Sequence, residues 1–408
     1  MLIVASGQKE SRPARSQLCL CGKSLLVPYW QKQEHVMKNV IENRLLQIRK
    51  SIFESGFDTF MVLIEENRRY LSGFTGEDSQ FDESAGALLI TEKELILATD
   101  SRFELQAANE APLYEIFCYK EGLPKALPDL LKRLQTKQLG FESTRLSYSQ
   151  HKKIVEQLHS VDRQVELVDT DGLVENLRVI KSEIEIEATK KALAIAESVF
   201  RDFTKTIIPG MTEKEAAWAM EKGMRESGAD SLSFSTIVAS GPNSALPHAI
   251  PGDREFKAGE PLLFDWGAKL NGYCSDISRT VVIGRPDDTF KKVYQAVLEA
   301  QQMALDAIRP GMSSKAVDEI ARTHIDKMGF KDKFGHGLGH GTGLAVHEAP
   351  RLSPLKDTTL EPGMLFTVEP GIYLAGWGGI RLENMAVVTR DGVEVLNNLE
   401  SSDFLIDV

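Results

Sequence analysis

The second half of this chain contains an internal repeat. The segment 209–214 reads Pro-Gly-Met-Thr-Glu-Lys, and it returns 101 residues later, at 310–315, as Pro-Gly-Met-Ser-Ser-Lys. Each copy has the features of a helix start, and the helical pattern that follows stops at a glycine in both copies, Gly228 and Gly329. A chain that repeats a helix start and a helix end at one offset is predicted to fold as two copies of one unit, related by a pseudo-twofold axis.

Acidic residues repeat together with the helices. In each copy an apolar, strand-like run follows a glycine, and an acid stands six residues after that glycine: Asp265 in the first copy and Glu369 in the second. A further acid, Asp276 or Glu383, precedes the next apolar run. Chance repetition of a helix start is common, whereas matched acids at matched strand ends are not. The repeat therefore predicts one site built from two acids of each copy.

The first pair of acids flanks the strongest hairpin signal in the chain. Asn271-Gly272 suits a type I′ turn because both residues tolerate a positive φ. With these two residues as the loop, Asp265 lies opposite Ser278, and Asp276 projects from the same face because strand side chains alternate. Two carboxylates directed at one point repel each other unless a cation or a shared proton lies between them. The hairpin is therefore predicted to hold metal.

A separate domain is predicted ahead of the repeat, because 408 residues exceed what one hydrophobic core usually supports. We place it at 37–165 and the repeat-containing domain at 166–408. In the first of these, strand patterns alternate with helical patterns, as is typical of an α/β layered domain. The predicted strands cover 58–64, 85–90, 94–98, 115–119 and 138–141, and the predicted helices cover about 36–56, 102–109, 124–134 and 149–158.

Residues 1–36 precede the regular pattern. We predict that they form a disordered extension, or that they lie upstream of a natural start near Met37. A short apolar run near their end has no small-residue cleavage site, which disfavours a secretory signal.

The composition excludes several classes of function. No run of about 18 apolar residues is present, so no membrane span is expected. The net charge of −11 argues against general nucleic-acid binding, which needs a basic face. The four cysteines are too scattered for a disulfide framework, which favours a reducing, cytoplasmic location.

A histidine-rich segment supplies candidate nitrogen ligands. Three histidines, His336, His340 and His347, fall within twelve residues. Glycines on both sides of His340 let the backbone bring its imidazole into a crowded site. The alternative is that all three are surface residues of a glycine-rich turn. Three histidines in so short a segment favour a contribution to the acidic site.

Five of these residues resemble a known ligand set. Asp265, Asp276, His340, Glu369 and Glu383, in this order and at this spacing, resemble the metal ligands of the pita-bread metallopeptidases, peptidase family M24. Within that superfamily the chain is similar to the aminopeptidase P and prolidase branch, which cleaves Xaa-Pro bonds. The resemblance covers about 170–400, and the domain before it resembles the creatinase-type N-terminal domain. It implies an α/β (α+β) architecture in which an α/β domain precedes a pita-bread catalytic domain.

The ligand types indicate the metal. Four carboxylates and one imidazole form a hard, oxygen-rich set that suits Mn²⁺, with Co²⁺, Zn²⁺ or Fe²⁺ as alternatives. The resemblance implies two divalent ions bridged by Asp276 and Glu383, with Asp265 completing one ion and His340 and Glu369 the other. It further implies that a metal-bridging hydroxide attacks the peptide bond before proline, and that Glu369 takes and returns its proton.

The resemblance also suggests roles around the metals. His347 would donate a hydrogen bond to the scissile carbonyl, His248 would form the opposite wall, and His336 would line the proline subsite. Arg381 either orients ligand carboxylates or pairs with a neighbouring acid. Arg351 either binds the terminal carboxylate of a dipeptide, which would favour a dipeptidase, or is an exposed loop charge.

The main prediction is an Xaa-Pro aminopeptidase or Xaa-Pro dipeptidase that acts as a cytoplasmic homodimer on small peptides with proline in the second position. A methionine aminopeptidase-like exopeptidase shares the ligand set but generally lacks a long N-terminal domain. An inactive pita-bread module that binds peptides or proteins, or a metal-free creatine hydrolase relative, would have lost ligand carboxylates. This chain keeps all four. No nucleic-acid or membrane partner is expected.

Overall fold

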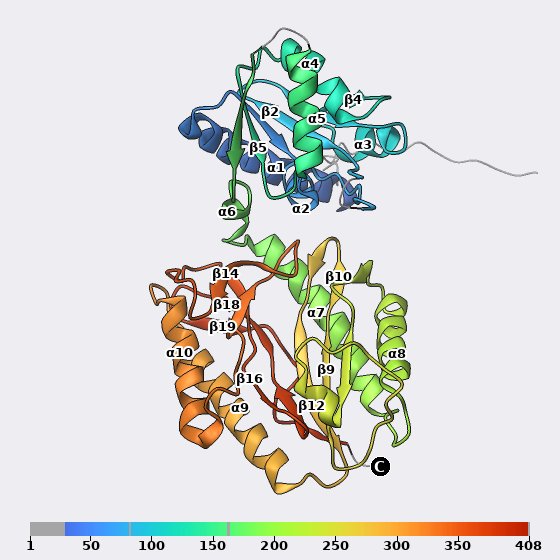
Figure 1. Cartoon of the computed structure of the whole chain (residues 1–408), viewed down its shortest axis with the longest axis vertical. Helices are drawn as coiled ribbons and strands as arrows, with labels where there is room; N and C mark the ends of the chain where they lie inside the picture. Colours follow the sequence, from blue (N-terminus) through green and yellow to red (C-terminus); the bar gives the residue numbers. More distant parts are fainter. Residues whose placement is uncertain (1–28, 81–82, 161–163, 407–408) are drawn as a thin grey trace, which may run out of the picture.

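The computed structural model describes residues 29–80, 83–160 and 164–406, which form an N-terminal and a C-terminal domain joined by the short helix α6 (Glu175–Arg178) (Figure 1). Most of the segment predicted as an extension, residues 1–28, lies outside the described residues. From Tyr29 the chain is helical, in α1 (Tyr29–Ser55), so this helix begins ahead of the position near residue 36 that its apolar pattern indicated. None of the described helices is long and apolar enough to span a bilayer.

The N-terminal domain is built on a six-stranded sheet in the order β4-β3-β2-β1-β5-β6, in which only β2 runs antiparallel to its neighbours. Its strands are β1 (Thr59–Val62), β2 (Ala87–Thr91), β3 (Leu95–Thr99), β4 (Glu115–Cys118), β5 (Gln138–Glu142) and β6 (Glu166–Thr170). Its helices, besides α1, are α2 (Glu65–Ser72), α3 (Glu104–Glu110), α4 (Leu123–Arg133) and α5 (Tyr148–His159). The sheet therefore continues through β6, past the predicted domain end at residue 165.

Alternating side chains of these strands divide the N-terminal core into two layers. Phe60 and Val62 of β1 pack in a cluster with α1 and α2, whereas Met61 packs with α4 and α5 on the other face. The strands are therefore buried on both faces, as expected for a sheet that is largely parallel.

The C-terminal domain contains the two predicted copies, with sheets in the middle and helices on the outside (Figure 1). The first copy comprises α7 (Glu183–Thr204), α8 (Glu213–Glu226), β7 (Ser231–Leu232), β8 (Ile237–Ser240), the 3₁₀ helix η1 (Gly241–Ala245), β9 (Pro261–Trp266), β10 (Ala268–Leu270), β11 (Tyr273–Cys274) and β12 (Ile277–Ile283). The second comprises α9 (Asp288–Ala307), α10 (Ser314–Ile325), the π-helical turn η2 (Asp326–Phe330), β13 (Gly339–Gly341), β14 (Glu348–Leu352), β15 (Leu365–Val368), β16 (Gly371–Leu374), β17 (Gly378–Arg381), β18 (Asn384–Val388), β19 (Val393–Val395) and β20 (Leu405–Ile406).

The repeated helix starts and ends are confirmed in the structure. Thr212 forms a capping box with Glu215 at the start of α8, and the side chain of Ser313 accepts a backbone N–H at the start of α10. Gly228 and Gly329 follow the two helices with φ of +97° and +91°, the left-handed region that ends helices. The duplication is therefore present in local backbone geometry.

The hairpin register is also confirmed. Asn271 and Gly272 have φ of 49° and 83°, as a type I′ turn requires. Strands β9 and β12 pair so that Ser278 lies opposite Asp265, the partner expected from a two-residue loop. Asp276 lies on the returning side of the same hairpin, between β11 and β12.

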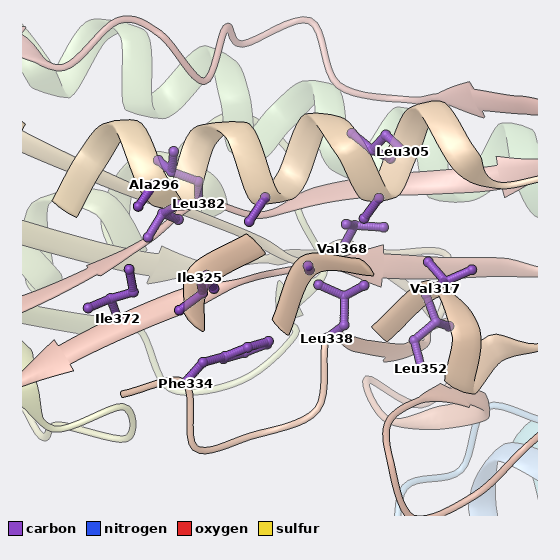
Figure 2. Close-up of a cluster of buried hydrophobic side chains, with 14 of the residues drawn as sticks. Ala296, Leu305, Val317, Ile325, Phe334, Leu338, Leu352, Val368, Ile372 and Leu382 are labelled. Carbon is purple, nitrogen blue, oxygen red and sulfur yellow. The ribbon is translucent and has the colours of Figure 1, made fainter. Parts of the chain in front are cut away.

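Apolar clusters fix the strands against the outer helices. In the second copy, Ala296 and Leu305 of α9 meet Val368 and Leu382 in one buried cluster (Figure 2). In the first copy, the ring of Phe200 on α7 stacks on Trp266 of β9 at a centroid distance of 4.3 Å. Because close-packed cores resist displacement, the strand ends that carry the acids are held in place.

Candidate metal centre and active site

One cavity of about 500 Å³ in the C-terminal domain is lined by every residue that the sequence assigned to the site. These residues are His248, Asp265, Asp276, His336, His340, His347, Arg351, Glu369, Arg381 and Glu383. They come from both copies of the repeat, so the cavity lies where the two copies meet. The rest of its lining includes apolar side chains such as Phe234, Ile237 and Ile250.

Three of the predicted ligands converge most closely. Ligand atoms of Asp276, His340 and Glu383 all lie within 4.8 Å of one another, and all three residues are buried. Asp276 directly precedes β12, His340 lies in β13, and Glu383 directly precedes β18. A nitrogen and two carboxylates that meet at this spacing can hold a divalent cation.

His340 presents one ring nitrogen to this group. Its Nδ1 lies 3.1 Å from the carbonyl oxygen of Gly341, which leaves Nε2 directed at Asp276 Oδ2 (3.6 Å) and Glu369 Oε1 (3.4 Å). Burial and, to a smaller extent, nearby His347 together lower the pKa of His340 to about 3. The imidazole is therefore neutral at physiological pH, which is the form that binds metal.

The carboxylates are placed where negative charge is costly. Burial raises the pKa of both Asp276 and Glu383 well above the ordinary value, and the neighbouring acids raise it further. Burial likewise raises the pKa of Glu369 to about 7, although Arg381 opposes this shift. A bound divalent cation would offset this cost, because its positive charge stabilises the ionised carboxylates.

Asp265 provides a direct test of fit for a metal ion. Its Oδ2 accepts a hydrogen bond from Arg381 at 2.6 Å, but its buried Oδ1 has no hydrogen-bond partner among the described residues. Buried polar atoms are normally satisfied, so a partnerless carboxylate oxygen on a residue that lines the cavity together with three other acids suits a cation ligand. The residues present therefore fit divalent metal.

Two hydroxyl side chains orient the ligands. Ser278 Oγ donates to Glu383 Oε2 at 2.8 Å, and Thr367 Oγ1 lies 3.2 Å from Glu369 Oε1. Thr367 Oγ1 also accepts the backbone N–H of His340 at 3.1 Å. From the sequence, Ser278 was expected only as a strand partner of Asp265, and Thr367 was assigned no role. Their strand positions next to ligands were the available signal, because such neighbours commonly fix ligand orientation.

Arg381 lies at the centre of a buried hydrogen-bond network. Besides Asp265, it contacts Ser278 Oγ at 2.8 Å and the hydroxyl of Tyr373 at 2.9 Å. The sequence left two possibilities for Arg381: that it orients ligand carboxylates, or that it pairs with a neighbouring acid. It pairs with Asp265, and this acid is itself one of the predicted ligands. Tyr373 also contacts His336 Nε2 at 2.9 Å, and no sequence signal had identified it.

The three remaining histidines occupy different environments. Both ring nitrogens of His336 have partners, Tyr373 and the carbonyl of Gly337, and burial lowers its pKa to about 4. The ring of His347 packs edge-on against His340 at a centroid distance of 4.3 Å. His248 is exposed, on the loop after η1 that forms one wall.

Arg351 is an exposed residue of β14, directly opposite His340 in the pairing of β13 and β14. No acid within the described part of the chain lies within salt-bridge distance of its guanidinium. Among the described residues that line the cavity, Arg351 thus offers a guanidinium without an acidic partner that can meet an anionic ligand.

Comparison with known proteins defines the class. Residues 187–390 match the model of metallopeptidase family M24, and residues 44–180 match that of the creatinase/prolidase N-terminal domain. The chain belongs to metallopeptidase family M24 and carries a creatinase-type N-terminal domain ahead of a pita-bread catalytic domain.

Individual relatives cover nearly the whole chain. An uncharacterized peptidase of Bacillus subtilis, YqhT, is 39% identical over 349 residues, 86% of this chain and 96% of its own length. A solved structure of the Xaa-Pro dipeptidase from Bacillus anthracis superposes with a TM-score of 0.83 at 39% identity, over 90% of this chain and 99% of that one. The X-Pro aminopeptidase from Thermotoga maritima gives 0.80 at 38% identity, over 89% and 99%.

Proposed function

We propose that this protein is a dinuclear metal-dependent exopeptidase that hydrolyses the bond before proline and releases the N-terminal residue of small peptides. The observation that carries the proposal is that five potential ligands from both copies line one cavity. It is supported by the buried oxygen of Asp265 that has no partner among the described residues. The relationship to an Xaa-Pro dipeptidase and an X-Pro aminopeptidase supports the choice of substrate.

In this proposal Asp276 and Glu383 would hold both ions, Asp265 would complete the ligands of one, and His340 and Glu369 those of the other. Mn²⁺ is the preferred metal because the set is dominated by carboxylate oxygen. Bound divalent ions would supply Lewis acidity and activate water for attack at neutral pH.

The protein's own groups then handle protons and charge. Glu369, whose pKa is raised by burial to about 7, would accept a proton and return it to the leaving amine. His347, on the cavity wall beside His340, would donate a hydrogen bond to the scissile carbonyl as negative charge develops there. His248 would contact substrate from the opposite wall, and His336, held by Tyr373, would line the proline subsite.

Between the two forms of Xaa-Pro peptidase, we favour the dipeptidase. The exposed guanidinium of Arg351 supports this choice, because it lines the cavity without a carboxylate partner among the described residues. A dipeptide offers a terminal carboxylate there, which arginine can bind through two parallel hydrogen bonds.

A direct assay compares Mn²⁺-dependent release of the first residue from Ala-Pro, Ala-Pro-Ala and Met-Ala-Ala. We expect cleavage of both proline peptides, with a clear preference for Ala-Pro. Activity confined to the methionine peptide would overturn the proposal in favour of a methionine aminopeptidase, and absence of any hydrolysis with metal bound would favour a binding module.

The proposal includes a cytoplasmic homodimer, as expected from the family resemblance. Both cysteines in the described part of the chain, Cys118 and Cys274, are free, which agrees with a reducing compartment. Light scattering during gel filtration measures the mass directly, and a monomer would contradict the dimer.

A further inference from the structure

The turn that carries His347 is organised by the side chain of the next residue. Glu348 Oε1 accepts the backbone N–H of Ala345 at 2.9 Å, so its carboxylate folds back into the turn. A Cβ atom on Gly343 would lie 2.9 Å from both carboxylate oxygens, so the backbone passes close to this group. The conformation of the turn therefore depends on where the carboxylate of Glu348 is held.

Two buried cations hold that carboxylate. Arg178 Nη2 donates to Glu348 Oε1, and Lys181 Nζ donates to Glu348 Oε2 at 2.8 Å. Arg178 and Lys181 are each 4% exposed. Burial alone would raise the pKa of Glu348, but the charges of Lys181 and Arg178 more than reverse this, so the carboxylate is ionised. Both cations belong to the segment that joins the N-terminal domain to α7.

The network continues into the N-terminal sheet. Arg178 Nη1 donates to Asn67 Oδ1 at 2.6 Å, and Asn67 Nδ2 donates to Glu142 Oε1 at 2.6 Å. Glu142 Oε2 in turn accepts the backbone N–H groups of Leu63 and Ile64, both at 2.6 Å. An unbroken path of hydrogen bonds thus connects the ends of β1 and β5 with the turn beside the candidate metal centre.

Stability alone is a weak explanation for this arrangement. Burying two cations and a carboxylate costs desolvation energy, and apolar side chains of similar volume often stabilise a fold as well or better. Charged groups add directional hydrogen bonds, which hold the Glu348 carboxylate in one position. His347 and Glu348 are consecutive, so their side chains leave the chain in different directions, one towards the cavity and one towards Arg178 and Lys181.

We propose that Glu348 is a positioning residue for His347, and that Arg178 and Lys181 make the N-terminal domain part of the catalytic machinery of its own chain. The inference rests on the proposed function, which gives His347 the task of stabilising the substrate carbonyl. The N-terminal domain fixes the turn, and the turn fixes the imidazole.

The kinetic test uses Glu348→Gln, which keeps the size of the side chain and removes its charge. We expect kcat for Ala-Pro to fall by about tenfold or more, because a small displacement of a catalytic group is costly, while KM stays within about threefold. The matched control is Glu394→Gln, which breaks the Lys190–Glu394 ion pair (2.6 Å) away from the cavity. This control is expected to leave both constants unchanged.

A double-mutant cycle separates positioning from general damage. In a His347→Ala background, Glu348→Gln should change kcat by no more than about twofold, because the group it positions is already absent. An equal loss in both backgrounds would overturn the proposal. If Glu348→Gln fails to fold, Lys181→Met combined with Glu348→Gln removes one charge of each sign and replaces it in the cycle.

A third experiment follows the environment of the His347 ring by NMR and does not depend on catalysis. With ¹³C-labelled histidine, the resonance of His347 is identified by its absence in His347→Ala. We expect it to shift or broaden in Glu348→Gln and to stay unchanged in Glu394→Gln. An unchanged resonance in Glu348→Gln would overturn the positioning role. If the wild-type protein cleaved no Xaa-Pro peptide, the proposed function would fail, while this measurement would still decide whether Glu348 positions the ring.

Discussion

The two copies of the catalytic domain share their scaffold down to individual backbone hydrogen bonds. At the helix start of the first copy, Gly210 N donates to Phe256 O at 3.0 Å, and at that of the second, Gly311 N donates to Leu360 O at 2.7 Å. The reverse bond, from the later segment back to the helix start, is 2.8 Å in both copies. The duplicated frame therefore brings acids from matched strand ends to one cavity.

The copies differ in the buried side chain that follows the helix cap. In the first copy this is Glu213, which is fully buried and accepts hydrogen bonds from Ser240 N (2.8 Å) and Gly252 N (3.0 Å). It thereby closes the loop that carries His248. The equivalent residue 101 positions later is Ser314, whose hydroxyl accepts a single bond from Thr358 N at 3.0 Å. The shared scaffold thus places the predicted ligands, whereas Glu213, which the second copy lacks, holds the loop that carries His248, a proposed substrate contact.

The largest expected effect tests whether both copies are needed. Asp276→Ala removes a proposed bridging ligand of the first copy, and Glu383→Ala removes its proposed counterpart in the second. Each is expected to reduce activity to background and to lower the bound metal measured by elemental analysis, because a two-metal site depends on its bridging carboxylates. Circular dichroism checks that the fold persists. Wild-type turnover by either variant in chelating buffer would show that the metal mechanism is wrong.

The next prediction concerns a residue of the second copy alone. Arg351→Ala is expected to raise KM for Ala-Pro by about 10- to 100-fold, because a charge-assisted hydrogen bond contributes about 1.5–3 kcal/mol. Hydrolysis of Ala-Pro-Ala should change little, since its carboxylate lies one residue farther on. Steady-state kinetics on both peptides measure this split. Equal losses on the two peptides would contradict a carboxylate-binding role.

A third prediction compares the two equivalent positions directly. Glu213→Gln leaves a backbone donor of the His248 loop without a good acceptor, so kcat/KM should fall by about tenfold. Ser314→Ala loses one hydrogen bond at a residue that does not line the cavity, so kcat/KM should stay within about twofold and stability should fall by about 1 kcal/mol. Kinetics and thermal unfolding of both variants provide the comparison. Equal kinetic effects would mean that the copies are not specialised in this way.

The parts of this site that could be predicted from the sequence are those that short-range patterns determine. The Asn271-Gly272 turn sets the pairing of Asp265 with Ser278, and the 101-residue offset relates the two helix starts. Strand alternation and glycine-bounded helices are local properties, so a single sequence displays them. The ligand spacing adds the remaining members by resemblance to a family.

Contacts between distant segments could not be predicted in the same way. Glu348 and Arg178 are 170 positions apart, and Tyr373 meets His336 across 37 residues, with no periodicity that relates the partners. The strand β6 was also missed, because its burial is partial and its pattern is short. Such features follow from how finished elements pack together, which local propensity does not determine.

The smallest expected effect lies outside both copies, at Glu142 in the N-terminal domain. Burial raises its pKa from the ordinary 4.5 to about 7, although the N–H groups of Ile64 and Leu63 oppose the shift. The folded state therefore binds the proton more tightly than the unfolded state, so this contribution to the free energy of unfolding is complete below the ordinary pKa and is lost as the pH rises through about 7. Glu142→Gln removes the titration, so the melting temperature of the wild type relative to this variant should fall between about pH 5 and about pH 8. Calorimetry at several pH values measures the difference, with Glu394→Gln as the surface control. If the melting temperatures of wild type and Glu142→Gln changed in parallel with pH, Glu142 would not change its protonation state in this range, and the prediction would be wrong.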